Sequence, residues 1–191
     1  MTRIGRLVTS GLAGVVVLLG SAAPLGGQTL KLSLHIQNQA DIQNDVLADA
    51  EEIVTRIFAA VGVEATFVDG EADVTIKLLS RHTENGLRRD VDTVGFAPSS
   101  ESERGHVAYV FQSRVDRIAE GYSAVRAVVL GAAIAHEVGH LLLPLNAHSK
   151  TGIMQPTWSQ LDFRRALHGQ LLFTSEQAAQ IRRRLINALP Q

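Results

Sequence analysis

The chain has 191 residues, a formal net charge of −1 at pH 7 and no cysteine. Without cysteine, a disulfide framework, a lipid-anchored lipoprotein and a thiol-based latency switch are all excluded. The 18 basic and 19 acidic side chains leave no surplus of positive charge to neutralise phosphates, which argues against nucleic acid as a partner.

Residues 1–27 have the pattern of a secretory signal peptide. Two arginines precede an apolar run from Leu7 to Leu19, and small residues follow. The run is shorter than the roughly 20 residues that span a bilayer as a helix. We therefore expect residues 28–191 to form a single exported domain, secreted or periplasmic, without stable membrane association. A retained N-terminal membrane anchor is the alternative.

The first two elements of this domain are predicted as a strand and a helix. From Leu30 to Ile36, apolar and polar residues alternate, as in a strand with one buried face. From Asp41 to Val61, apolar residues recur at the three- and four-residue spacing of an amphipathic helix. Gly62 then ends the helical pattern.

Three later segments read as strands. Residues 63–68 and 72–79 are rich in β-branched and apolar residues and are separated by the Asp69–Gly70 turn. Residues 105–111 form the third, after a polar loop at 80–93 and a serine- and acid-rich link. The coarse order is therefore strand, helix, strands, and then the helical half of the chain.

A short apolar segment, Val94 to Ala97, stands between the polar loop and the third of these strands. Pro98 follows it and confines it to a sheet edge, because proline cannot donate a ladder hydrogen bond. An exposed edge can bind an extended peptide as an added strand, which makes Gly95, Phe96 and Ala97 candidate substrate-binding residues. A hydrophobic plug that pins the loop is the alternative interpretation.

Residues 123–143 predict one buried helix. Ser123 is a suitable N-cap, Pro144 prevents continuation, and between Val125 and Ala135 only Arg126 is charged. A helix that is apolar almost all round lies in a core, where polar side chains are costly unless something satisfies them.

The C-terminal turns of this helix carry His136, Glu137 and His140. Histidines four residues apart project from one helix face and can reach one ion at ~2.0–2.1 Å. Glu137 lies beside them, where a carboxylate can take a proton from a zinc-bound water without ligating. Surface histidines flanking an ion-paired glutamate are the alternative, but that arrangement needs an exposed helix. The pattern therefore predicts a zinc site.

A catalytic zinc site requires a third protein ligand. The candidates downstream are His148, Asp162 and Glu176. Asp162 also suits a cap or surface position, and Glu176 suits the first turn of a final helix beginning near residue 174. His148 is favoured because it is close in sequence and is a common zinc ligand. The remaining candidates, His82, His106 and His168, lack ligand-like spacing and are expected to be structural or exposed.

These motifs resemble the metzincin metallopeptidases. The shared features are His136-Glu137-x-x-His140, a nearby third histidine, and the segment from Gly152 through Met154 to Pro156. The resemblance implies that His136, His140 and His148 ligate zinc, that Glu137 is the general base, and that Met154 is the methionine of the Met-turn beneath the metal. The segment around Met154 is most similar to the matrixin branch.

The sequence departs from the metzincin pattern between the second and third histidines. Metzincins place the third ligand six residues after the second, whereas His148 follows His140 by eight. Asn146 occupies the usual third-ligand position, and Leu143 occupies that of the usual glycine. We interpret the difference as a two-residue insertion within the segment from Leu143 to Ala147.

The resemblance implies an α+β domain with a twisted, mostly parallel sheet, a backing helix, an active-site helix, a Met-turn and a C-terminal helix. It implies a secreted zinc metalloendopeptidase that hydrolyses peptide or protein substrates by zinc-activated water, with Glu137 as general base. Two alternatives are a secreted zinc-binding domain without catalysis, and a membrane-tethered domain whose zinc is structural. The sequence does not indicate an oligomeric state.

Overall fold

The computed structural model describes residues 29–84, 94–98, 106–122 and 125–188, so the predicted signal segment lies outside the described residues. The strands are β1 (Leu30–Gln39), β2 (Val63–Phe67), β3 (Val74–Leu79), β4 (Gly95–Phe96) and β5 (Val107–Phe111). The helices are α1 (Asn44–Ala59), α2 (Arg81–Glu84), α3 (Gln112–Tyr122), α4 (Arg126–Leu142), α5 (Gln160–Leu167) and α6 (Ser175–Ala188).

The five described strands form one sheet in the order β2-β1-β3-β5-β4. The strands β2, β1, β3 and β5 run parallel, and β4 pairs antiparallel with β5 at the edge. The mostly parallel sheet that the metzincin resemblance implied is therefore confirmed. The predicted edge position of the Val94–Ala97 segment is also confirmed, although only two of its residues form the strand.

Strands β2 and β3, which were predicted on either side of the Asp69–Gly70 turn, are both present but do not pair with each other. They lie on opposite sides of β1. β2 pairs with residues 30–34 of β1 and β3 with residues 34–39. Because β3 starts at the level where β2 ends, a short connection can cross from one side of β1 to the other without a return helix.

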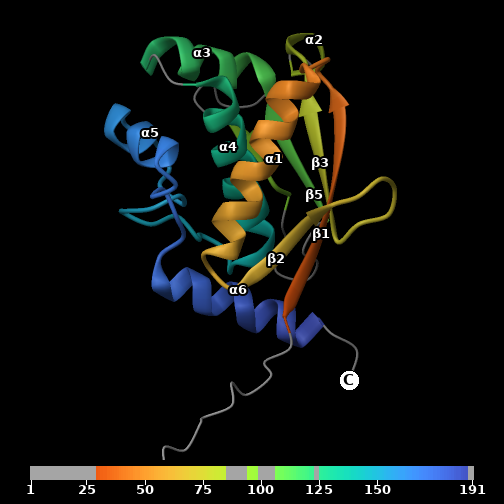
Figure 1. The fold of residues 1–191 in the computed structure, drawn as a ribbon, viewed down its shortest axis with the longest axis vertical. Helices are drawn as coiled ribbons and strands as arrows, with labels where there is room; N and C mark the ends of the chain where they lie inside the picture. Colours follow the sequence, from red (N-terminus) through yellow and green to blue (C-terminus); the bar gives the residue numbers. More distant parts are fainter. Residues whose placement is uncertain (1–28, 85–93, 99–105, 123–124, 189–191) are drawn as a thin grey trace, which may run out of the picture.

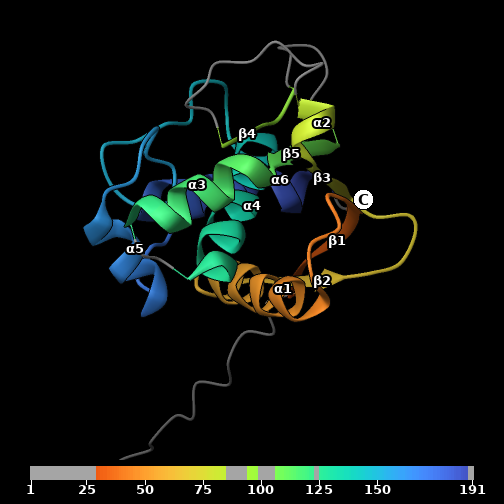
Figure 2. The same ribbon diagram turned by 90° about the horizontal axis from the view of Figure 1, so that it is seen from above.

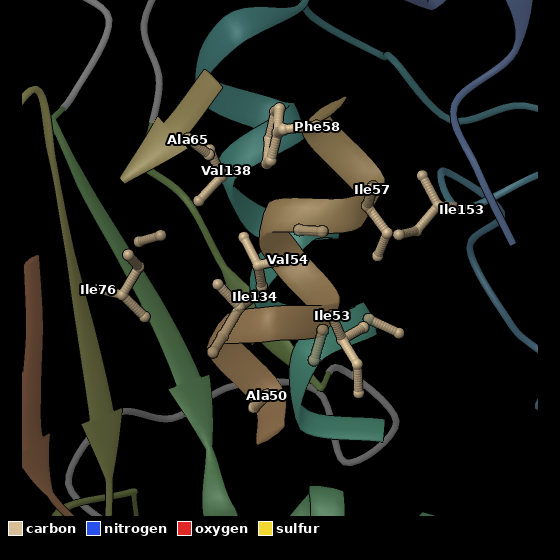
Figure 3. Close-up of a cluster of buried hydrophobic side chains, with 14 of the residues drawn as sticks. Ala50, Ile53, Val54, Ile57, Phe58, Ala65, Ile76, Ile134, Val138 and Ile153 are labelled. Carbon is tan, nitrogen blue, oxygen red and sulfur yellow. The ribbon is translucent and has the colours of Figure 1, made fainter. Parts of the chain in front are cut away.

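The helices gather on one face of the sheet. α1 and α4 lie side by side, α3 runs next to α4, and α6 crosses one end of the layer, where it contacts α4 and β1 (Figures 1 and 2). In the core, Ile53, Val54 and Ile57 of α1 meet Ile134 and Val138 of α4 (Figure 3). Burial of apolar surface at this layer contributes about 25 cal/mol per Å² to the stability of the fold.

Three helices, α2, α3 and α5, were missing from the sequence prediction, and one began at a different residue. α2 falls in the segment that was predicted as a polar loop. α3 buries only Arg114, Val115 and Ala119, and its other residues are partly or fully exposed, so its apolar pattern is weak. α5 has eight residues and starts at a capping box. The buried helix predicted from Ser123 begins at Arg126, with Val125 at its N-cap. Ser123 itself lies outside the described residues.

None of the helices within the described residues is long and apolar enough to cross a membrane.

Candidate metal centre

Helix α4 fixes three of the predicted site residues. Every residue of this helix is buried apart from Arg126 and His140, which are partly exposed. His136 retains 8% of its exposed surface and Glu137 retains 5%. The sequence prediction of a buried helix carrying polar side chains near its C-terminal end is therefore confirmed.

The imidazoles of His136 and His140 face each other across one turn of the helix. Their Nε2 atoms lie 3.0 Å apart. Two nitrogens bound to one tetrahedral ion at ~2.0–2.1 Å would be separated by about 3.3–3.4 Å. The pair therefore needs little adjustment to bind one ion.

His148 reaches the same point from the turn that follows α4. The helix ends at Leu142, Leu143 is extended and buried, and Pro144 follows. Asn146 has a positive φ of 60°, a conformation that asparagine tolerates better than most residues. The longer turn is thus built from proline and a left-handed asparagine in place of the glycine turn of the metzincin pattern.

The three histidines form a cluster that is able to bind one zinc ion. One nitrogen from each of His136, His140 and His148 lies within 4.8 Å of the others. The ring centroid of His148 is 5.4 Å from that of His136 and 4.8 Å from that of His140. Three imidazoles are the donor set of known catalytic zinc sites that keep a fourth position open. Ligation by these particular atoms stays a prediction.

The tautomer of His136 suits a metal ligand. Its Nδ1 lies 2.8 Å from the carbonyl oxygen of Ile153, an acceptor, so Nδ1 carries the proton and Nε2 presents its lone pair to the cluster. The same carbonyl accepts a second hydrogen bond, of 3.1 Å, from the indole N–H of Trp158. The rings of Trp158 and His136 meet edge to face at a centroid distance of 5.4 Å.

Met154 supports the helix beneath the histidines. It is fully buried, and its sulfur would lie 2.7 Å from a Cβ placed on Gly139. A ring carbon of Phe173 would lie 2.8 Å from the same Cβ. The glycine therefore lets the Met154 segment pack directly against the face of α4 that carries both histidines. This position agrees with the predicted Met-turn, although the role itself stays a prediction.

Glu137 is covered by the edge strand. A Cβ on Gly95 would lie 2.9 Å from the Oε1 atom of Glu137 and 2.3 Å from the carbonyl oxygen of Tyr109. Only glycine allows β4 to lie this close to both groups. The next residue, Phe96, stacks on Tyr109 at a centroid distance of 4.5 Å, so the strand is also anchored as the plug interpretation expects.

Burial shifts the pKa values of the site residues. Desolvation raises the pKa of Glu137 to about 8 and lowers that of His136 to about 4. It lowers the pKa of His140 to about 3, helped by the neighbouring histidines. Both helix histidines are therefore neutral at pH 7, which is the state that binds a metal, and Glu137 can hold a proton in the metal-free protein.

A cavity of about 590 Å³ opens in front of the cluster. Its walls come from the β4 segment, from α3, and from the stretch between Gln155 and Phe163. The three histidines and Glu137 line it together with Gly95, Phe96 and Ala97, the predicted substrate-binding residues. The structure therefore brings every predicted site residue except the buried Met154 to one cavity.

The other candidate ligands lie elsewhere. Asp162 accepts hydrogen bonds from the side chain and backbone N–H of Ser159 in the capping box of α5, and Glu176 lies in the first turn of α6. Burial acts to raise the pKa of Asp162, but these hydrogen bonds outweigh it and hold the pKa below the usual range. His106 bonds the carbonyl of Asp73 through its ring nitrogen, as expected of a structural histidine.

The sequence prediction singled out neither Trp158 nor Gln177, although it expected residues 157–170 to form one wall of the pocket. Trp158 shares an acceptor with His136, as described above. Gln177, from α6, donates to the carbonyl of Ala147 at 3.1 Å and to the hydroxyl of Ser149 at 3.2 Å. The single tryptophan after the Met154 segment was a signal for the first. The second is recognisable only as a helix cap, since its partners lie about 30 residues earlier.

No protein-family model matches the chain, and no curated protein matches it. Among solved structures, the fold is similar to the crystal structure of archaemetzincin from Methanopyrus kandleri, with a TM-score of 0.52. The two sequences are 14% identical, and the match covers 85% of this chain and 99% of that one. The mixed fold with a mostly parallel sheet is thus shared with archaemetzincin. At this identity the similarity concerns the fold.

Proposed function

We propose that this chain is an exported zinc metalloendopeptidase in which His136, His140 and His148 hold the metal and Glu137 is the general base. The observation that supports the proposal most strongly is the meeting of three histidines and one buried glutamate at a single cavity. The similarity of the fold to archaemetzincin adds support, because the name of that protein places it among the metzincins. A matrixin-like active site is the finer form of the proposal.

The donor set fits zinc because all three ligands are imidazoles and the two on the helix are neutral at physiological pH. When bound, zinc supplies Lewis-acid chemistry: it activates water and polarises the scissile carbonyl. The rest of the reaction is assigned to residues of the chain.

Glu137 transfers the proton in this scheme. Its carboxylate accepts a proton from water as the water oxygen bonds to the scissile carbonyl carbon. It then delivers the proton to the amine nitrogen as the C–N bond breaks. Burial under Gly95 favours the protonated form in the metal-free protein, whereas a nearby cation favours the carboxylate. The opposing influences suit a group that must both take and return a proton.

The edge strand β4 is proposed to bind the substrate. It is the terminal strand of the sheet, and Gly95, Phe96 and Ala97 line the cavity that holds the histidines. A peptide added antiparallel to β4 would bring its backbone alongside Glu137. The apolar walls formed by Ile118 and Trp158 would contact the substrate side chains.

The test is cleavage of a diverse peptide library by the exported protein, beside Glu137→Ala and a control, Glu176→Ala. We expect Glu137→Ala to lose about 10²–10⁴-fold in turnover and to bind zinc within a few-fold of wild type. Glu176→Ala should change neither property, because Glu176 lies outside the cavity. Turnover retained by Glu137→Ala would refute its role.

Zinc binding can be followed by the fluorescence of Trp158, the only tryptophan in the chain, which contacts the ring of His136. Zinc binding with no cleavage by any variant would instead favour a zinc-binding domain without catalysis. The mass of the exported protein tests the remaining element of the proposal: an intact N-terminus would support a membrane anchor and contradict signal cleavage.

A further inference from the structure

The buried amide of Gln177 connects the last helix to the turn that carries His148. Gln177 lies in the first turn of α6 and retains 6% exposure. Its Nε2 atom donates to the carbonyl oxygen of Ala147 at 3.1 Å and to the hydroxyl oxygen of Ser149 at 3.2 Å. These are the residues immediately before and after His148, so one side chain bonds the backbone before the proposed third ligand and the Ser149 hydroxyl after it.

The other end of the same amide caps its own helix. The Oε1 atom of Gln177 accepts a hydrogen bond of 3.0 Å from the backbone N–H of Thr174, and the backbone N–H of Gln177 donates to the Thr174 hydroxyl at 3.3 Å. This reciprocal pair is a capping box. Because the oxygen meets a donor and the nitrogen meets two acceptors, the orientation of the amide is fixed by its surroundings.

The network continues from the His148 turn into the Met154 segment. The Ser149 hydroxyl donates to the carbonyl of Thr151 at 2.8 Å, and the Ser149 backbone N–H donates to the carbonyl of Met154 at 2.9 Å. The hydroxyl is therefore satisfied as both donor and acceptor when it receives the Gln177 bond. The turn, the Met154 segment and α6 are thereby linked by specific hydrogen bonds.

We propose that Gln177 is the positioning residue for His148, the third metal ligand. The inference rests on the proposed zinc site and deepens it. His148 is exposed and follows a turn whose residues Pro144, Leu145 and Asn146 are also exposed. In this stretch only the partly buried Ala147 packs against the core. The Gln177 amide adds a directional constraint and holds the longer turn so that His148 faces the pair on α4.

The sharpest variant is Gln177→Glu, which separates the two functions of the side chain. Glutamate retains an oxygen acceptor for Thr174 and so preserves the capping box. It replaces the donor NH2 by a second oxygen, which removes the donor of the bonds to Ala147 and Ser149 and places two acceptors together at the Ala147 carbonyl. Gln177→Ala removes both functions, and Glu176→Gln is the matched control because it changes a neighbouring exposed side chain of the same helix.

The measurement is the zinc dissociation constant, by chelator competition, alone and in a His148→Ala background. We expect Gln177→Glu to raise the dissociation constant by about tenfold, the lower end of the range for partners that orient metal ligands. With His148 replaced, the same substitution should have no further effect, because its influence acts through that ligand. Ser149→Ala should weaken zinc binding less, since one of the two bonds remains, and Glu176→Gln should not change it.

The inference is overturned if Gln177→Glu binds zinc within twofold of wild type, or if it weakens binding equally without His148. If Gln177→Glu does not fold, Ser149→Ala is tested in its place, with His148 present and with His148→Ala. The inference then requires that Ser149→Ala weaken zinc binding only when His148 is present. If wild type binds no zinc, the proposed function fails.

The ring NMR signals of His148 in the metal-free protein then test whether Gln177 positions that residue. A shift of these signals in Gln177→Glu supports the positioning, and unchanged signals contradict it. Absence of peptide cleavage leaves these zinc-binding tests valid.

Discussion

The candidate metal centre joins two regions of different construction. Helix α4 buries His136 and Glu137 and holds His140 one turn further along, whereas His148 lies on an exposed turn that depends on α6 for its position. Ligands on a packed helix are ordered before the metal arrives. A ligand on an exposed turn loses conformational freedom when the metal binds, so part of its binding energy is spent on ordering. The two regions should therefore respond differently to substitution.

The largest expected difference is in zinc affinity. Four-ligand structural zinc sites bind with roughly 10–16 kcal/mol, so one ligand contributes about 3–4 kcal/mol, or roughly 10²–10³-fold. We expect His140→Ala to lose affinity at the upper end of this range and His148→Ala at the lower end. Isothermal titration with a competing chelator measures both. Equal losses would show that the turn is as well ordered as the helix.

The burial of Glu137 should make the free energy of unfolding of the metal-free protein depend on pH. Its pKa is raised to about 8 in the folded state, so folding favours the protonated form. The contribution of Glu137 to the free energy of unfolding is fully present below its unfolded-state pKa near 4.5. It is lost as the pH rises towards 8. Glu137→Gln should therefore be more stable than wild type by up to ~3 kcal/mol at pH 7, with little difference at pH 4. Urea unfolding at both pH values checks this, and an equal difference at both would contradict it.

A single methyl group added to α4 at Gly139 should destabilise its packing on the Met154 segment. Gly139→Ala places a Cβ within 2.8 Å of Met154 and Phe173, and overpacking of this kind costs about 1–3 kcal/mol. Gly121→Ala is the control, because a Cβ there has no neighbour within 4 Å. Thermal unfolding should show a lower melting temperature for Gly139→Ala only. A Gly139→Ala protein as stable as the Gly121→Ala control would mean that the Met154 segment moves easily.

The smallest effect is expected in the turn itself. Asn146 adopts a left-handed conformation with φ of 60°, which costs alanine roughly 1 kcal/mol relative to glycine. Asn146→Ala should be less stable than Asn146→Gly by about that amount in chemical unfolding. A second readout is the zinc dissociation constant. If Asn146→Ala changes zinc affinity more than stability, the turn conformation contributes directly to the placement of His148.

The sequence placed the candidate site residues of α4 on one buried helix because their signals are local. Histidines four apart on an apolar helix are brought together by the helix itself, and no distant contact is needed. The position of His148 depends on more: the turn from Leu143, the conformation of Asn146 and the hydrogen bonds of Gln177. Asp162 was the weaker ligand candidate by spacing, and it takes the cap position that its sequence context also suited. Its capping role depends on where α5 begins, and α5 was not predicted.

The errors in the fold have the same physical origin. Strands β2 and β3 were recognised, but their pairing depends on their register with β1, which local patterns do not contain. α3 was missed because few of its residues are buried. α3 forms part of the cavity wall only because the tertiary structure places it beside α4.

The sequence by itself determined the buried helix and the placement of His136, Glu137 and His140 on it, because hydrophobic periodicity and short spacing act within one element. Only the tertiary structure decided which strands pair, which carbonyl orients His136, and which helix holds the His148 turn. Those contacts join residues far apart in the chain, and their geometry exists only after the layers have packed.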